Sequence, residues 1–198
     1  MDRRITEIIE KYYPPGSIAH SIYMPHCTAV TDLALKIARL HPEFHADEEV
    51  VEFGGMLHDI GIFFTNAPEI GCYGELRYLA HGYKGRELLE KEGLPLIAPC
   101  CERHIGVGIS IEDINKYNLP LPKRDMMPQT IEEKIVCYAD KFYSKSADNL
   151  HQPKPLEKVK KSINKYGEDK WKIFEGMMET FGIDFIYPQK PNLHSGKF

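Results

Sequence analysis

The stretch GGMLHDIG at residues 54–61 decides the fold, because it joins the end of a helical pattern to a His-Asp pair. The apolar residues before that pair recur at intervals of three or four, at Val50, Val51, Gly54 and Leu57. This spacing predicts an amphipathic helix over residues 47–58, with Asp47 as its N-cap. His58 follows Gly54 by four positions and therefore shares the buried face of that helix.

The same periodicity runs through most of the chain and predicts an all-α protein. Further helices are expected at residues 2–12, 26–40, 78–92 and 95–105, from Thr130 onward, and at 155–165 and 167–181. Glycine and proline interrupt the pattern at residues 62–77 and 106–128, which are expected to be long loops. No stretch alternates apolar and polar residues for long, so no strand is predicted.

The composition excludes several classes of protein. The chain has 198 residues, enough for one domain, and its 25 basic and 29 acidic side chains give a net charge of −4. A mildly acidic protein lacks the basic face that non-specific nucleic-acid binding requires. No apolar run is long enough to span a membrane, and the amphipathic start MDRRITEIIEKYY is unlike a signal peptide. Five cysteines without a CxxC pair are typical of reduced thiols, so a cytoplasmic, single-domain protein is expected.

Histidines and aspartates carry the candidate chemistry. Helical spacing places six of them on apolar helix faces or directly beside one: His26, His58, Asp59, His81, His104 and Asp140. A single inward histidine is usually an ordinary core residue, whereas a carboxylate is costly to bury unless a cation compensates its charge. Several imidazoles and two carboxylates in one core form a donor set for a divalent metal. Such ligands suit Mn, Fe, Co, Ni or Zn, while Ca or Mg sites use oxygen ligands alone.

The order of these residues, and the phrases around them, resemble the HD superfamily of metal-dependent phosphohydrolases, specifically its HDIG subgroup. The matching phrases are HCTAVTDLALKIA, GGMLHDIG, YLAHGYKGRELL, ERHIGVGI and EEKIVCYADK. The resemblance covers about residues 20–148 and implies an all-α HD fold. Residues 149–198 would then add two C-terminal helices and a flexible tail to the same domain.

The resemblance also implies a binuclear metal centre. The first metal would be held by His26, His58, Asp59 and Asp140. His81 and His104 would hold a second metal, with Asp59 bridging the two. HD-type diadenosine tetraphosphate hydrolases have a similar arrangement.

Two departures from the family pattern limit the phosphate contacts and substrates that the resemblance implies. Ile62 follows Gly61, where many HDIG proteins have a lysine, so one phosphate contact is missing. The residues after His81 are Gly-Tyr-Lys and lack the GYP tripeptide, which disfavours cleavage of cyclic di-GMP.

The expected reaction is hydrolysis of a phosphate ester or anhydride in a small, nucleotide-like substrate. Two divalent metals would hold a bridging hydroxide and clamp the phosphate oxygens. Asp59 is expected to accept the proton of the attacking water. Lys84, one turn beyond His81, is the candidate phosphate contact. Arg103 beside His104 is either a second such contact or a structural ion-pair partner.

Two other functions remain open on the residues alone. Mixed-valence diiron oxygenases similar to inositol oxygenase use an HD fold and an equivalent ligand set, so ligand identity does not separate them from hydrolases. A metal-stabilised domain that binds a nucleotide without cleaving it is the third reading. Oxygen uptake would indicate the oxygenase, while a nucleotide that raises the melting temperature without being hydrolysed would indicate the binding module.

Overall fold

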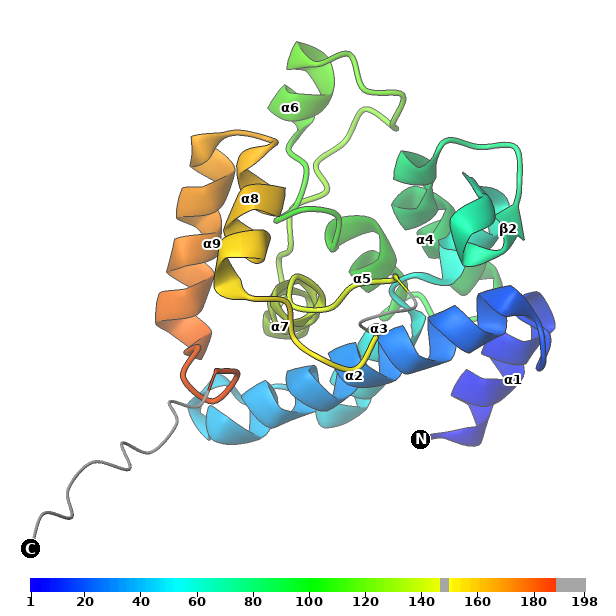
Figure 1. The fold of residues 1–198 in the computed structure, drawn as a ribbon, viewed down its shortest axis with the longest axis horizontal. Coiled ribbons are helices and arrows are strands. Elements are labelled where there is room, and N and C mark those ends of the chain that lie inside the picture. The colour runs from blue at the N-terminus through cyan, green and yellow to red at the C-terminus, as the bar shows by residue number, and fades with distance from the viewer. Residues whose placement is uncertain (147–149, 188–198) are drawn as a thin grey trace, which may run out of the picture.

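The long helix α2 (Ile18–Leu40) crosses the base of the molecule, and most of the other helices lie against it or above it (Figure 1). The protein is described here from a computed structural model, which describes residues 1–146 and 150–187. The Ser17 hydroxyl caps α2 by accepting a hydrogen bond from the His20 amide at 3.1 Å. The short helix α1 (Arg3–Tyr12), predicted over 2–12, precedes it.

The predicted start of this helix at residue 26 is wrong, because α2 runs through Pro25 without ending. Proline removes one backbone hydrogen bond from a helix and usually breaks it. Here the turns before Pro25 bury three apolar side chains, Ala19, Ile22 and Tyr23. Burial of that face outweighs the missing bond, and this tertiary gain is invisible to a local sequence rule.

The helix predicted over 47–58 is confirmed as α3 (Glu48–Leu57), which packs along α2. Asp47 caps it as predicted and accepts hydrogen bonds from the Glu49 and Val50 amides at 2.9 and 3.3 Å. The two helices approach closely, since a Cβ atom at Gly55 would lie 2.5 Å from the hydroxyl of Thr31. After α2, the 3₁₀ helix η1 (Pro42–Phe44) makes the turn into α3.

The segment predicted as a loop over 62–77 is built from short regular elements. It holds the 3₁₀ helices η2 (Ile60–Phe64) and η3 (Pro68–Ile70) and a hairpin of β1 (Asn66–Ala67) and β2 (Cys72–Tyr73). The strands pair antiparallel, Asn66 with Tyr73 and Ala67 with Cys72. Strands of two residues are too short to show alternation, so the prediction of no strand is wrong at this hairpin.

The next two predicted helices exist but are shorter than expected. Residues 78–92 begin as the 3₁₀ helix η4 (Tyr78–Ala80) and continue as α4 (His81–Lys91). The helix predicted over 95–105 is the shorter α5 (Ala98–Arg103), which has Pro99 in its first turn, where the missing N–H of proline removes no helical hydrogen bond. Helices α4 and α5 pack side by side.

A helix that the sequence did not predict, α6 (Ile111–Lys116), lies inside the second expected loop. Ser110 and Asp113 form a capping box that starts it, a signal that the proline-rich surroundings obscured. Thr130 caps α7 (Ile131–Asp140), as expected. The two predicted C-terminal helices are α8 (Leu156–Asn164) and α9 (Glu168–Phe181), while the expected flexible tail after Pro188 lies outside the described residues.

An aromatic cluster joins the C-terminal helices to the rest of the fold. Tyr138 of α7 packs against Phe174 and Phe181 of α9, with ring centroids 5.2 and 5.4 Å apart. All three side chains are buried. The predicted all-α class is confirmed, and no helix of the described residues is long and apolar enough to cross a bilayer.

Gly61 offers a test of how tightly η2 packs against α4. A Cβ atom at Gly61 would lie 2.0 Å from the carbonyl oxygen of His81 and 2.4 Å from the amide of Gly85. We therefore expect Gly61→Ala to lower the free energy of unfolding by roughly 1–3 kcal/mol, measured by urea denaturation. Gly176→Ala is the matched control: no atom lies within 4 Å of its Cβ position in α9. It should raise stability by about 0.5–1 kcal/mol. An unchanged urea midpoint for Gly61→Ala would contradict the close packing.

Candidate metal centre

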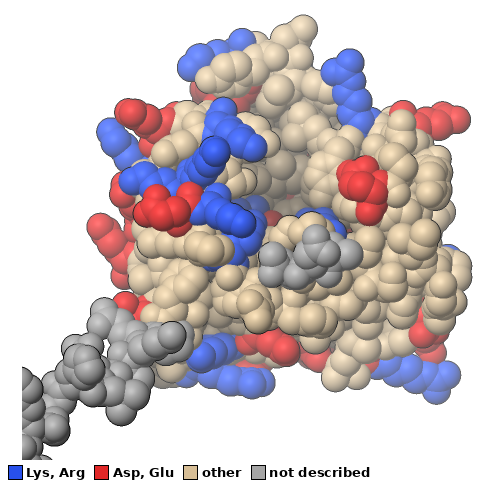
Figure 2. Space-filling model, in the orientation of Figure 1, with Lys and Arg blue, Asp and Glu red and all other residues tan. Residues whose placement is uncertain are grey.

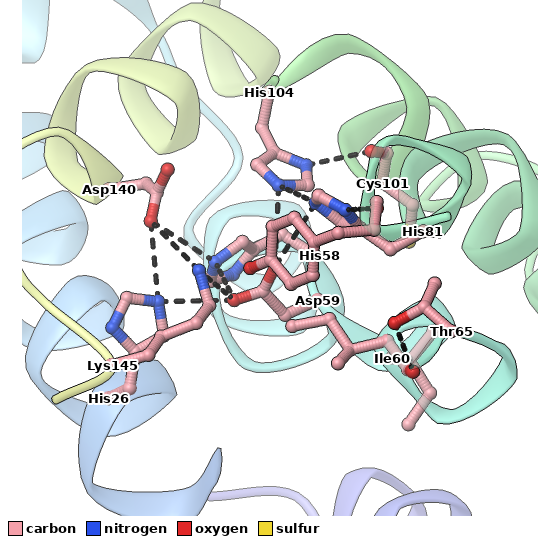
Figure 3. Close-up of polar contacts among 12 residues, drawn as sticks. His26, His58, Asp59, Ile60, Thr65, His81, Cys101, His104, Asp140 and Lys145 are labelled. Carbon is pink, nitrogen blue, oxygen red and sulfur yellow. Dashed lines mark hydrogen bonds and ion pairs between the residues drawn. The ribbon is translucent and has the colours of Figure 1, made fainter. Parts of the chain in front are cut away.

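Six buried polar side chains meet at one point in the core, and they come from five different helices or helix ends (Figure 3). His26 lies mid-way along α2, and His58 and Asp59 follow α3 directly. His81 opens α4, His104 caps the end of α5, and Asp140 closes α7. These are the six residues that the sequence singled out as metal ligands, and the fold brings all of them together.

The Asp59 carboxylate stands at the centre of this cluster, with each oxygen facing a different group. Its Oδ2 atom lies 3.1 Å from Nε2 of His26 and 3.1 Å from Nε2 of His58. Its Oδ1 atom lies 3.5 Å from Nε2 of His81 and 3.4 Å from Nε2 of His104. Asp140 joins the first group, with Oδ1 at 3.3 Å from Nε2 of His26.

The donor atoms form two compact sets, each within 4.8 Å. One set is His26, His58, Asp59 and Asp140, and the other is Asp59, His81 and His104. Both sets share Asp59, so the two positions are adjacent.

Backbone carbonyls fix the orientation of three of the rings. Nδ1 of His58 lies 2.7 Å from the Gly55 oxygen, and Nδ1 of His81 lies 2.6 Å from the Tyr78 oxygen. His104 makes the same contact with the Cys101 oxygen at 2.7 Å. A carbonyl only accepts, so Nδ1 carries the proton and a neutral ring turns the lone pair of Nε2 toward Asp59.

The cluster contains more acceptors than the protein can satisfy. Nε2 of His81 and Nε2 of His104 face each other at 3.1 Å, and in neutral rings neither atom has a proton to share. The buried atoms without a hydrogen-bond partner include Nε2 of His26 and Oδ1 of Asp59. Buried lone pairs aimed at one point fit a bound cation, and imidazole with carboxylate is a donor set for Mn, Fe, Co, Ni or Zn.

Burial and charge set the protonation states of the rings. Burial, reinforced by the neighbouring His104, lowers the pKa of His81 to about 3, and burial also lowers the pKa of His104. Both rings are therefore neutral at pH 7, the form that binds a metal. Burial opposes the charge of His58 as well, but Asp59 and Asp140 outweigh it and raise its pKa to about 9.

Two lysines that the sequence analysis did not select compensate the carboxylates. Nζ of Lys145 lies 2.7 Å from Oδ2 of Asp59, and Nζ of Lys141 lies 2.7 Å from Oδ2 of Asp140. Burial alone would raise the pKa of Asp59, but His58 and Lys145 hold it well below its usual range. Lys145 follows the end of α7, where no helical periodicity marks the direction of a side chain, so only its closeness to Asp140 in the chain could have pointed to it.

The two predicted phosphate contacts lie elsewhere. Lys84 pairs with Glu87 at 2.8 Å, and NH1 of Arg103 donates to both oxygens of Glu133 at 2.8 and 2.9 Å. Neither side chain lines the cavity that opens on the cluster. The ion-pair alternative for Arg103 is therefore what this structure contains, and contact of either residue with phosphate stays a prediction.

A cavity of about 1000 Å³ leads from the surface to the cluster. His81, His104 and Asp140 line it, and its other walls come from residues 105–119, from the segment after α7, and from α8 with the turn that follows it. Figure 2 shows the molecule hollowed on this face. A small molecule that enters the cavity therefore reaches the donor atoms of the cluster directly.

These features define a helical protein with a buried histidine–aspartate cluster, compatible with divalent metal, at the end of an open cavity. The comparison of sequence families agrees, because residues 23–144 match the HD domain. That match covers more than half of the chain, and the protein belongs to the HD domain family.

Relatives with known sequences share part of this chain. An uncharacterized protein of Methanocaldococcus jannaschii is 40% identical over 118 residues, which is 58% of this chain and 62% of the relative. A tRNA (cytidine(56)-2′-O)-methyltransferase of Picrophilus torridus is 35% identical over 127 residues, 64% of this chain and 33% of the relative. The enzyme of that name from Thermoplasma volcanium is 33% identical over 120 residues, 60% and 31% of the two chains. The chain thus spans under two thirds of the first relative and about a third of the other two. No solved structure matches it significantly.

Metal binding should release a proton from His58. With its pKa raised to about 9, the ring carries a proton at pH 7 and must lose it before Nε2 can bind a metal. We expect release of about one proton at pH 7 and weaker binding as the pH falls, because protons then compete for the ring. Calorimetric titration of the metal-free protein with Mn²⁺ or Zn²⁺, in buffers that differ in ionisation enthalpy, measures this number. Binding without proton release would contradict the predicted charge of His58.

Proposed function

We propose that this protein is a metal-dependent phosphohydrolase that cleaves a phosphate ester or anhydride bond in a small, nucleotide-like substrate. The observation that carries the proposal is the position of Asp59, whose two oxygens face two different groups of ligand atoms at 3.1–3.5 Å. A carboxylate placed in this way suits two metals side by side, with His26, His58 and Asp140 on one and His81 and His104 on the other.

The chain's own residues divide the work of such a reaction. Bound metals would supply a hydroxide at neutral pH and neutralise charge on the phosphate oxygens. Asp59, held ionised by His58 and Lys145, is suited to bridging the metals, and its low pKa makes it a weak base for the predicted proton transfer. Lys141 and Lys145 place two ammonium groups on the cavity wall, where the oxygens of a phosphate would lie.

The charges of the cavity favour a phosphorylated ligand over the oxygenase alternative. Lysines beside the metals suit the oxygens of a phosphorylated ligand, whereas an oxygenase with the same ligands does not require them. The names of two relatives point to tRNA methylation, but this chain spans only about a third of each of those proteins. Their methyl transfer therefore does not enter the proposal.

Loss of a ligand should abolish hydrolysis. We expect His58→Ala and Asp59→Ala to lose on the order of 10²-fold or more in phosphate release, because even the partners that orient metal ligands contribute 10–100-fold. His45→Asn is the control: His45 is exposed, and asparagine tolerates its left-handed backbone. Phosphate release from a panel of nucleotides and sugar phosphates measures the effect. Full activity in both ligand variants would contradict the proposal.

Metal content should distinguish the two positions. We expect His81→Ala to lose about half of the bound metal, because it belongs to only one of the two donor sets, and Asp59→Ala to lose nearly all. Elemental analysis of protein purified without chelator or histidine tag gives both values. About one metal ion per chain in both the wild type and His81→Ala would leave a mononuclear site. Iron in both positions, with oxygen uptake and no phosphate release, would favour the oxygenase instead.

A further inference from the structure

The outer wall of the cavity is built by a part of the chain that lies beyond the HD match. That match ends at residue 144, whereas Lys154, Val159 and Ile163 line the cavity from α8 and the segment before it. Figure 2 shows basic side chains along the rim of the hollow on the side where α8 and α9 lie in Figure 1. The C-terminal extension therefore adds surface, and positive charge, to a site whose metal ligands all lie in the HD region.

Lys154 is held firmly in this wall by its backbone. Its amide donates to the Phe142 oxygen at 2.6 Å, and its carbonyl accepts a hydrogen bond from the hydroxyl of Tyr187. Phe142 is fully buried just after α7, and Tyr187 follows α9. Lys154 is thus tied both to the element that supplies Asp140 and to the end of the extension, which fixes where its side chain enters the cavity.

The charge of Lys154, unlike those of Lys141 and Lys145, is not matched by a carboxylate of the described residues. Lys145 and Lys141 each lie 2.7 Å from a carboxylate of the cluster. No carboxylate of residues 1–146 or 150–187 lies within 4.0 Å of Nζ of Lys154. Burial and the repulsion of Lys141 and Lys145 lower its pKa to about 8 against the pull of Asp140. A half-buried ammonium without a partner is costly, and a bound anion would offset that cost.

We propose that Lys154 binds a second phosphate of the substrate, while the first occupies the metal centre. The substrate class is then a small molecule with two or more phosphate groups. This assignment rests on the proposed function, since it supposes that the metal centre takes the phosphate to be cleaved. The preference for such substrates comes from the C-terminal extension and not from the HD region.

The test compares compounds that share one organic part and differ in phosphate number. Adenosine 5′-monophosphate has one phosphate, adenosine 3′,5′-bisphosphate carries two at separate positions, and ADP carries two in a chain. Phosphate release and calorimetric binding are measured for the metal-loaded wild type, Lys154→Gln and Lys154→Arg. Lys158→Gln is the matched control, because Lys158 is an exposed lysine of α8 that does not line the cavity.

We expect the wild type to favour at least one doubly phosphorylated compound by tenfold or more in kcat/KM and in Kd. Lys154→Gln should remove that preference and leave kcat/KM and Kd for the monophosphate within twofold of the wild type. Lys154→Arg should keep most of the preference, and Lys158→Gln should keep all of it. Which of the two compounds is favoured tells whether the second phosphate is adjacent to the first or separate from it.

The outcomes separate this inference from the proposed function. Hydrolysis without a preference, or an equal loss on both kinds of compound in Lys154→Gln, overturns the second phosphate site and leaves the hydrolase. A Lys154-dependent preference in binding, with no compound hydrolysed, supports the site and overturns the hydrolase. Absence of both binding and hydrolysis overturns both.

Discussion

The fold depends on the burial of one carboxylate, Asp59, which has no exposed surface. An ionised carboxylate in a protein core is unfavourable by many kcal/mol unless cations or hydrogen-bond donors surround it. The charged ring of His58 and the ammonium of Lys145 compensate Asp59 here, while the neutral rings of His81 and His104 face it with lone pairs that a metal cation would satisfy, and these groups come from separate segments of the chain. Five helices or helix ends must therefore meet at one point. This requirement explains why the ligands lie at the ends of α3, α4, α5 and α7, where the chain can turn away after delivering a side chain.

Close backbone packing and fixed ring orientation together arrange the converging side chains so that their donor atoms face one another. Because residue 61 is a glycine, η2 can pack closely against the first turn of α4. This contact brings Asp59 near His81. The carbonyls behind His58, His81 and His104 then hold the rings so that their free nitrogens face inward. The carbonyls of Gly55 and Cys101 lie in the last turns of α3 and α5, where backbone acceptors are free, so the geometry that ends these two helices also orients their histidines.

The sequence predicted the part of this arrangement that follows from periodicity. His26, His58 and Asp140 lie on the faces that helical spacing assigned to the core, α3, α8 and α9 begin and end within a residue of expectation, and α7 begins where expected. Lys145 and Lys154 were missed because both follow α7 outside any helix, so no repeat indicates where their side chains point. Pro25 misled the prediction of α2 for the opposite reason, since a strong local rule was overridden by burial. Local spacing thus predicts the ligands that helices carry, whereas the cations depend on tertiary contacts.

The candidate metal ligands and the cations of the cavity wall lie in different parts of the chain, and this separation bears on substrate specificity. The ligands of the metal centre lie within residues 23–144, the region shared with the HD domain family, and their geometry constrains any substitution among them. The extension after residue 144 supplies Lys145, Lys154 and one wall of the cavity, and it is tied to the core by the contacts of Tyr138 with Phe174 and Phe181. Charge at Lys154 can change with little effect on the ligands, because Lys154, unlike Lys145, forms no ion pair with the described carboxylates of the cluster, and substitutions in separate contacts act nearly independently. Under the proposed function, bond cleavage would depend on the HD region, and the choice of substrate would depend on the segment that covers it.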